Sequence, residues 1–281
     1  MKQTISVKMD HEVLVYMNGL SYACRQHWFH HTMQDLKMDL IVPKMREGHK
    51  PCPAIVWICG GAYRVVDRSI WMPEMIWFAR KGYVVASVEY RTSNEAQFPA
   101  ALIDVKAAIR YLKAHAETFA IDPDRICVMG ESAGGTLACL AGLTAGAEEF
   151  EQGDNLRVDS SVKAVVDFYG LVDFTIPALH VSEEIPAWTI QDFLGEDYSE
   201  EVARKASAVA YVNENTPPFL ILHGTKDQVV PIRQSEVLEE ALKRHHVYYE
   251  AYLLEGAEHG TDEFYQEEVL QRVAAFLDKV V

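Results

Sequence analysis

Cysteine is scarce in this chain, and its few cysteines do not stand at spacings that bind metal or shuttle disulfides. They are odd in number and scattered over 281 residues, as Cys24, Cys52, Cys59, Cys127 and Cys139. No pair forms the short C-x-x-C spacing of a zinc knuckle or a redox site. Scattered thiols are typical of a reducing compartment, so we expect a cytoplasmic protein.

Long apolar runs are also missing. The first residues, MKQTISVKMDHEV, lack the apolar core of a secretory signal. No uncharged run approaches the roughly 18 residues that a bilayer span requires. We therefore expect no signal peptide and no membrane partner.

Basic residues are fewer than acidic ones. The chain has 26 lysines and arginines against 41 aspartates and glutamates, for a net charge of −15. Such a surface repels phosphate backbones, which argues against a nucleic-acid partner. No glycine-rich nucleotide loop occurs, and the neighbouring histidines His30 and His31, like His245 and His246, would point apart on a helix or strand. We expect neither a cofactor nor a metal.

Apolar patterning predicts a single α/β domain over residues 1–281. Short runs that are apolar on both faces are typical of buried parallel strands, and they cover residues 37–42, 54–58, 83–88, 126–129, 164–168, 219–222 and 248–254. Helical spacing lies between them, at residues 100–116, 136–143, 233–244 and 261–280. This alternation predicts a mostly parallel, doubly wound sheet with helices on both faces. The stretch before residue 37 is poorly patterned.

Residues 173–210 break the alternation. They read as irregular, with Pro177, Pro186 and Trp188 among many acids. Long irregular connections are often functional, so we predict a small lid insertion over the carboxyl edge of the sheet. A solvated surface excursion is the alternative.

The central chemical signal is Gly130-Glu131-Ser132-Ala133-Gly134. It follows a predicted strand and precedes a stretch of small residues with helical character. The pattern G-x-S-x-G in that context is a nucleophile elbow, which presents a serine on a tight strand-to-helix turn. We predict Ser132 as a nucleophile.

A serine hydroxyl needs a base, and the base needs an orienting acid. Asp227 lies in the loop after the strand at residues 219–222, and His259 lies in the loop after the strand at 248–254. Loops after parallel strands meet at one edge of the sheet. We predict His259 as the base and Asp227 as its partner.

Acyl transfer also needs donors for an oxyanion. Cys59-Gly60-Gly61-Ala62-Tyr63 follows the strand at residues 54–58. We predict the amides of Gly61 and Ala62 as donors, together with that of Ala133 after the nucleophile. A plain Gly-Gly turn is the alternative reading.

Four further side chains are candidates for contact with substrate. They are Tyr63, Glu131, Trp188 and Val230. Core packing would account equally well for an aromatic residue such as Tyr63 or Trp188.

With these motifs in place, the chain resembles the carboxylesterases of the hormone-sensitive-lipase and feruloyl/acetylxylan-esterase branch of the α/β-hydrolases. The resemblance runs from about residue 36 to the last residue. It includes the loops above and the segments Glu89-Tyr90-Arg91, Phe98-Pro99-Ala100 and 121–125. It implies an α/β-hydrolase fold and metal-free hydrolysis of short acyl esters through an acyl-enzyme, with acetyl or feruloyl esters of carbohydrates among the substrates.

One residue departs from the family pattern. The family usually has histidine at the first position of its oxyanion loop, and this chain has Cys59. That histidine is thought to brace the loop, so the resemblance still implies activity, with altered support of the loop. A compact filler below the loop is the other role open to Cys59.

Two other functions remain open at this stage. Catalytic domains of prolyl oligopeptidases look similar, which makes a serine peptidase an alternative. A ligand-binding receptor of the same fold is a second, although such receptors lack the histidine that this chain retains. The expected partner is a small ester substrate, and a homodimer is the default assembly.

Overall fold

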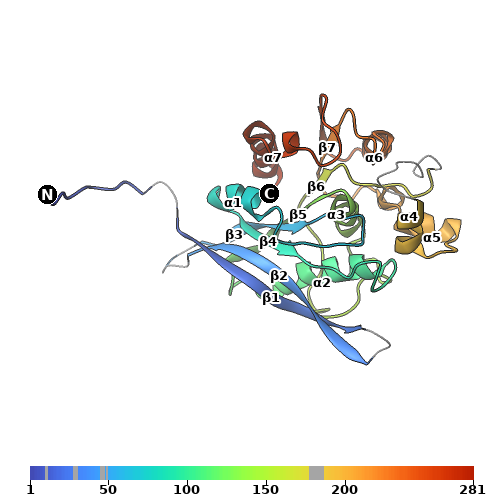
Figure 1. Cartoon of the computed structure of the whole chain (residues 1–281), viewed down its shortest axis with the longest axis horizontal. Coiled ribbons are helices and arrows are strands. Elements are labelled where there is room, and N and C mark those ends of the chain that lie inside the picture. Colours follow the sequence, from blue (N-terminus) through green and yellow to red (C-terminus); the bar gives the residue numbers. More distant parts are fainter. Residues whose placement is uncertain (10–11, 28–30, 45–47, 49, 177–186) are drawn as a thin grey trace.

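A mixed sheet forms the centre of the molecule (Figure 1). The computed structural model describes residues 1–9, 12–27, 31–44, 48, 50–176 and 187–281, with only the backbone described at 187 and 188. Within these residues, eight strands lie in the order β1-β2-β4-β3-β5-β6-β7-β8. The strands are β1 (Leu14–His27), β2 (Thr32–Pro43), β3 (Cys52–Ile58), β4 (Val84–Val88), β5 (Ile121–Glu131), β6 (Val165–Phe168), β7 (Phe219–Gly224) and β8 (Tyr249–Leu254).

The sheet is mostly parallel, as expected. Strand β2 is antiparallel to both β1 and β4, and each of the other neighbouring pairs is parallel. Helices connect the parallel strands because a parallel pair needs a crossover. The helices are α1 (Met72–Arg80), α2 (Ala100–Ala114), α3 (Ala133–Leu143), α4 (Ala187–Leu194), α5 (Glu200–Ala206), α6 (Arg233–Arg244) and α7 (Glu267–Val280).

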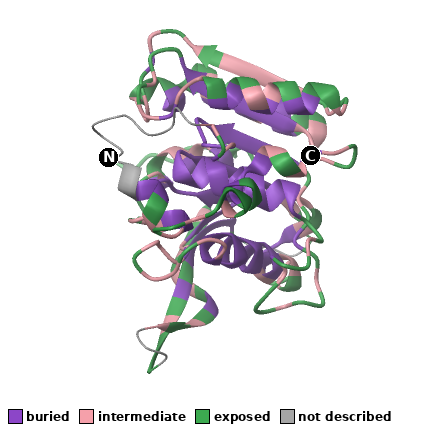
Figure 2. Ribbon diagram, turned by 90° about the vertical axis from the view of Figure 1, so that its right-hand side faces the viewer, coloured by how far each residue is buried: buried purple, intermediate pink, exposed green. Residues whose placement is uncertain are grey.

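Two apolar cores sandwich the sheet, so the prediction of helices on both faces is confirmed. Helices α2, α3 and α6 pack on one face, and α1 and α7 pack on the other. Side chains alternate between the cores along a strand, as Val128 and Met129 of β5 do. Figure 2 shows the result, with buried residues filling the central strands and the helix faces turned toward them.

The structure corrects the expectation for the first part of the chain. The poorly patterned stretch contains β1, which pairs with β2 in a long antiparallel hairpin. Strand β1 lies at the edge of the sheet, and most of its residues are partly or fully exposed. A half-solvated strand carries a weak apolar pattern, which explains why the strand was missed.

A second correction concerns residues 173–210. Residues 177–186 lie outside the described part of the chain, as do Pro177 and Pro186. The remainder is not irregular, because it contains α4, α5 and a short 3-10 helix, Ala208–Tyr211. Ser199 caps α5 by accepting a hydrogen bond from the amide of Val202. Both helices are short, and short helices leave little periodicity to recognise.

Candidate active site

Four loops meet at the carboxyl edge of the sheet, and they follow β3, β5, β7 and β8. Strands β3 and β5 are neighbours, while the chain leaves β3 for β4 on one side and leaves β5 for β6 on the other. A reversal of this kind opens a crevice at the carboxyl ends of the two strands. The predicted nucleophile and the predicted oxyanion loop lie at that crevice.

Ser132 stands on the sharp turn between β5 and α3. Its φ angle of 54° falls in the left-handed region, which is strained for a residue with a side chain. Close approach of the backbones requires the flanking glycines. A Cβ atom on Gly130 would lie 2.3 Å from the Gly134 carbonyl oxygen, and one on Gly134 would lie 2.0 Å from that of Ile58.

A chain of hydrogen bonds runs from Ser132 to Asp227. His259 Nε2 lies 2.8 Å from Ser132 Oγ, and His259 Nδ1 lies 2.7 Å from Asp227 Oδ2. A carboxylate can only accept a hydrogen bond. Nδ1 therefore carries the ring proton, and Nε2 is left to accept the proton of the serine hydroxyl.

The carboxylate of Asp227 is fully buried and held by its own loop. Its Oδ1 accepts hydrogen bonds of 2.8 Å from the amides of Val229 and Val230. Oδ1 is thus occupied by backbone donors, and Oδ2 is left for His259. The ring of Tyr169 also contacts the His259 imidazole, in an edge-on arrangement with 4.7 Å between the ring centroids.

His223 is a residue of the site that sequence reasoning missed. It is the second-to-last residue of β7 and is fully buried, and its Nε2 lies 2.9 Å from the Val230 carbonyl oxygen. Because a carbonyl only accepts, Nε2 is protonated and Nδ1 accepts from the Ser235 hydroxyl at 2.7 Å. Burial lowers the pKa of His223, which keeps the ring neutral. The ring joins the start of α6 to the loop that holds Asp227.

The loop after β3 is wound through three successive left-handed residues. Gly61, Ala62 and Tyr63 have φ angles of 123°, 53° and 60°. A Cβ atom on Gly61 would lie 2.1 Å from the Val65 carbonyl oxygen, so glycine is required there. Among the described residues, no acceptor takes a hydrogen bond from the amide of Gly61, Ala62 or Ala133. Unpartnered amides of this kind suit a developing oxyanion.

Glu131 lies beneath this loop rather than in the cavity beside Ser132. Its Oε1 accepts hydrogen bonds from the amide of Gly60 at 2.5 Å and from Trp71 Nε1 at 3.2 Å. A side chain on Gly60 would collide with the carboxylate at 2.6 Å. Burial raises the pKa of Glu131, and these donors oppose the shift. The predicted substrate contact is therefore placed as a support of the loop.

Cys59 occupies the position where the family usually has histidine. Its side chain is buried, with Sγ 3.8 Å from Ser87 Oγ. Burial raises the pKa of the thiol to about 12, so it stays protonated and is a poor nucleophile. The backbone carbonyl of Cys59 accepts a 2.8 Å hydrogen bond from the Tyr90 hydroxyl. Cys59 fills space below the loop, and Tyr90 braces its backbone.

A small cavity of ≈ 20 Å³ opens at Ser132, room for one or two water molecules. Its wall includes Tyr63 and Val230, two of the predicted substrate contacts, and it is completed by Ala62, Ala133, Leu171, Thr189, Ile190 and Val229. The Tyr63 ring stacks on Phe193 at 3.9 Å, and its hydroxyl donates to Thr136. The side chain of Trp188 lies outside the described residues. Thr189 and Ile190 come from α4, so part of the 173–210 segment forms this wall.

The described residues contain neither a membrane-spanning helix nor a metal-binding cluster. None of their helices is both long and apolar enough to cross a membrane. No cluster of three or more histidine, cysteine, aspartate or glutamate side chains among them could hold a metal ion.

The fold and the geometry at Ser132 define the class of protein, which is an α/β-hydrolase. The chain belongs to the BD-FAE family, whose model matches residues 38–242. Among curated proteins it is similar to Esterase LipC of Mycobacterium tuberculosis, with 35% identity over 76% of this chain and 54% of the relative. The chain spans about half the length of the curated relatives that it matches.

Solved structures show the same likeness. A truncated carbohydrate esterase from gut microbiota superposes with a TM-score of 0.78 and 28% identity, covering 94% of this chain and 95% of the other. Esterase 2 of Thermogutta terrifontis with bound butyrate gives a TM-score of 0.75 and 25% identity, covering 88% of this chain and 90% of the other.

Proposed function

We propose that this chain is a serine carboxylesterase that hydrolyses short acyl esters. The observation that supports this most directly is the hydrogen-bonded series Ser132, His259 and Asp227, which lies beside the open amides of Gly61, Ala62 and Ala133. Membership of an esterase family adds to it.

The proposed reaction has two halves. In the first, Ser132 Oγ attacks the ester carbonyl carbon and passes its proton to His259 Nε2, while Asp227 stabilises the imidazolium. The carbonyl oxygen becomes an oxyanion that the three amides bind. The C–O bond to the alcohol then breaks, and the alcohol leaves with the proton from His259. In the second half, water loses a proton to His259 and attacks the acyl-enzyme; the bond from the acyl carbon to Ser132 Oγ then breaks, His259 returns the proton to Ser132, and the acid leaves.

Replacement of the nucleophile tests this directly. We expect Ser132→Ala to lower kcat for p-nitrophenyl acetate by roughly 10⁴-fold or more. Ser161→Ala is a matched control, because Ser161 is exposed and hydrogen-bonds only on the surface. A fluorophosphonate probe should label the wild type and the control but not Ser132→Ala. Equal turnover by all three proteins would contradict the proposal.

We propose an acyl preference from acetyl to butyryl. The cavity at Ser132 is small, and the apolar side chains of Leu171, Ile190 and Val230 limit it. The similar Thermogutta esterase has been solved with butyrate. A series of p-nitrophenyl esters from acetyl to octanoyl should show falling kcat/KM beyond butyryl, and Leu171→Ala should move the optimum to longer chains. A wild-type optimum at octanoyl would contradict this.

The alcohol portion is proposed to be a carbohydrate. The similar gut-microbiota protein is titled a carbohydrate esterase. Acetylated xylo-oligosaccharides, methyl ferulate and proline-containing peptides form a suitable panel. Release of acetate from the sugars supports the proposal, and cleavage of the peptides without ester cleavage would replace it with a peptidase.

Two wider proposals follow from the same site. We propose that residues 1–281 act as one catalytic domain, with the segment 173–210 as its cover, because α4 contributes to the wall at Ser132. We also propose a cytoplasmic location, which the five free cysteines support. Activity recovered only in an exported fraction of the source cells would contradict that location.

A further inference from the structure

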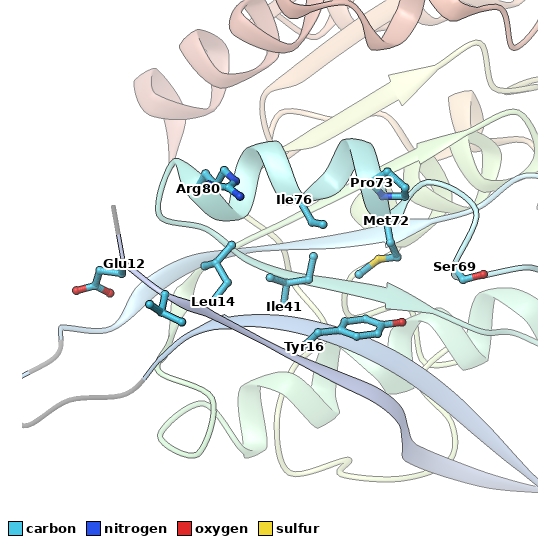
Figure 3. Close-up of a pocket in the computed structure, with 10 residues that line it drawn as sticks. Glu12, Leu14, Tyr16, Ile41, Ser69, Met72, Pro73, Ile76 and Arg80 are labelled. Carbon is cyan, nitrogen blue, oxygen red and sulfur yellow. The ribbon is translucent and has the colours of Figure 1, made fainter. Parts of the chain in front are cut away.

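An apolar groove on the described surface shares no lining residue with the cavity at Ser132. It lies between the first half of β1 and the helix α1, with Ile41 of β2 at its floor, and its volume is ≈ 640 Å³ (Figure 3). The apolar part of the wall comes from Val13, Leu14, Tyr16, Ile41, Met72, Pro73 and Ile76. None of these residues lines the cavity at Ser132. The groove therefore has no part in the proposed reaction.

Exposed apolar side chains gather around this groove and in the segment that precedes it. Val13 and Tyr16 are about half exposed in the groove wall, at 52% and 51%. Residues 1–9 form an extended arm that runs away from the body (Figure 1). In this arm Ile5, Val7 and Met9 are 77%, 71% and 63% exposed. Contiguous exposed apolar surface of this kind marks an interaction site.

The arm has the pattern and the length to fill the groove. Ile5, Val7 and Met9 alternate with the polar residues Ser6 and Lys8, so an extended arm places its apolar side chains on one face. Five extended residues span about 16 Å. The nine residues of α1 run for about 13 Å at the usual rise of a helix. The apolar face of residues 5–9 therefore matches the long wall of the groove.

Charge also favours contact between the arm and a second body. Residues 1–9 contain two lysines and no acid, whereas the whole chain has a net charge of −15. The groove itself is lined by one acid, Glu12, and one base, Arg80, so the attraction at low ionic strength is between the basic arm and the acidic chain as a whole. Within one copy, the groove begins at Glu12, only three residues after the arm. In the structure the arm runs away from the body, so residues 5–9 do not lie in their own groove, and a second copy can present its arm to that groove (Figure 1).

We propose that residues 5–9 of one copy pack into the β1–α1 groove of a second copy, and that the exchange is reciprocal. Ile5, Val7 and Met9 then face Tyr16, Met72 and Ile76 of the partner copy. A two-fold arrangement uses the same arm and the same groove twice, which closes the assembly as a dimer.

Analytical ultracentrifugation of the full chain over a concentration series tests the proposal. We expect a dimer for the wild type. Val7→Asp in the arm and Ile76→Asp in the groove should each raise the dimer dissociation constant at least tenfold. Leu156→Asp is the matched control, since Leu156 is 57% exposed outside both surfaces, and it should remain dimeric. Esterase activity and circular dichroism of the variants check that each is folded.

Cross-linking separates exchange between copies from folding back within one. The double variant Val7→Cys with Ile76→Cys should yield a covalent dimer on a non-reducing gel, and neither single variant should match its yield. Three results would overturn the proposal. They are a wild type that stays monomeric at all concentrations, a dimer unaffected by Val7→Asp and Ile76→Asp, and a double-cysteine variant that oxidises only within one chain.

Discussion

Two loops lie beside Ser132, the proposed oxyanion loop after β3 and the loop after β7 that carries Asp227, and they are supported in different ways. The oxyanion loop depends on one buried acid, Glu131, whose carboxylate binds the Gly60 amide from below. The loop after β7 that carries Asp227, the acid loop, depends on neutral groups. The His223 ring joins Val230 to Ser235, and the amides of Val229 and Val230 hold the Asp227 carboxylate. The oxyanion loop therefore has an acidic support in addition to neutral ones such as the Tyr90 hydroxyl, and the other loop is supported by neutral groups only.

The difference follows from what each loop must present. The oxyanion loop presents amide hydrogens, and an anion below it accepts from the neighbouring Gly60 amide without competing for those of Gly61 and Ala62. The acid loop already contains the carboxylate of Asp227. A second anion there would be repelled, so a neutral imidazole is the better neighbour. Hydrogen bonds to a charged group are about twice as strong as neutral ones, so we expect Glu131 to matter more to its loop than the neutral His223 ring matters to the other.

The largest expected effect comes from removing that support. Glu131→Ala leaves the Gly60 amide and Trp71 Nε1 without their acceptor. We expect kcat for p-nitrophenyl acetate to fall roughly 10²–10³-fold, the usual effect of losing an oxyanion donor, with a smaller change in KM. Glu131→Gln keeps an oxygen for Gly60 and should recover most of the loss. If both variants retained wild-type kcat, the loop would not depend on residue 131.

A buried acid that supports neither loop sharpens the comparison. Asp167 of β6 is fully buried; its Oδ1 accepts from the Gly170 amide, and its Oδ2 has no partner among the described residues. Burial raises the pKa of Asp167 to about 7. The folded protein therefore retains this proton while the unfolded chain loses it near pH 4. The contribution to stability is complete below about pH 4 and is lost as the pH rises to about 7.

Asp167→Asn should remove this pH dependence. At pH 8 we expect the variant to be more stable by about 2 kcal/mol, below the roughly 4 kcal/mol that three pKa units imply, because the new amide also lacks a partner. At pH 4.5 the gain should disappear. Urea unfolding measures the free energy of unfolding of the variant and the wild type at each pH. A variant that is less stable than the wild type at pH 8 would show that the ionised carboxylate is stabilising.

Site residues could be predicted from the sequence where their position directly after a predicted strand indicates their role. Ser132, Asp227, His259 and Gly61 each lie after a strand of the parallel part of the sheet, and parallel strands bring such loops to one edge. The mostly parallel, doubly wound sheet was likewise predictable from the short apolar runs, and the family resemblance implied the α/β-hydrolase fold.

The supports were not predictable because they depend on contacts across the fold. Glu131 and Gly60 are 71 positions apart, and nothing in the sequence shows that the Glu131 carboxylate turns below the loop instead of toward substrate. His223 came directly after the predicted strand at residues 219–222, and its role appears only once Ser235 on α6 lies against it. Strand β1 and helix α4 were not predicted for a different reason. Strand β1 is largely exposed to solvent and α4 is short, so each has a weak apolar pattern.

We expect the smallest fall in kcat from a change in the acid loop, because several neutral groups support that loop together. His223→Ala removes the bonds to Val230 and Ser235, but the amides of Val229 and Val230 still hold Asp227. We expect kcat to fall about tenfold, or roughly 1.4 kcal/mol of barrier, with KM little changed. His223→Gln can still donate to the Val230 carbonyl and should recover part of the loss.

Because a looser Asp227 stabilises the imidazolium less, the acid limb of the kcat/KM profile should also move to lower pH in His223→Ala. A fall in stability with an unchanged pH profile would mean that His223 supports only the fold, and a loss as large as that of Glu131→Ala would mean that the two loops are equally dependent on a single residue.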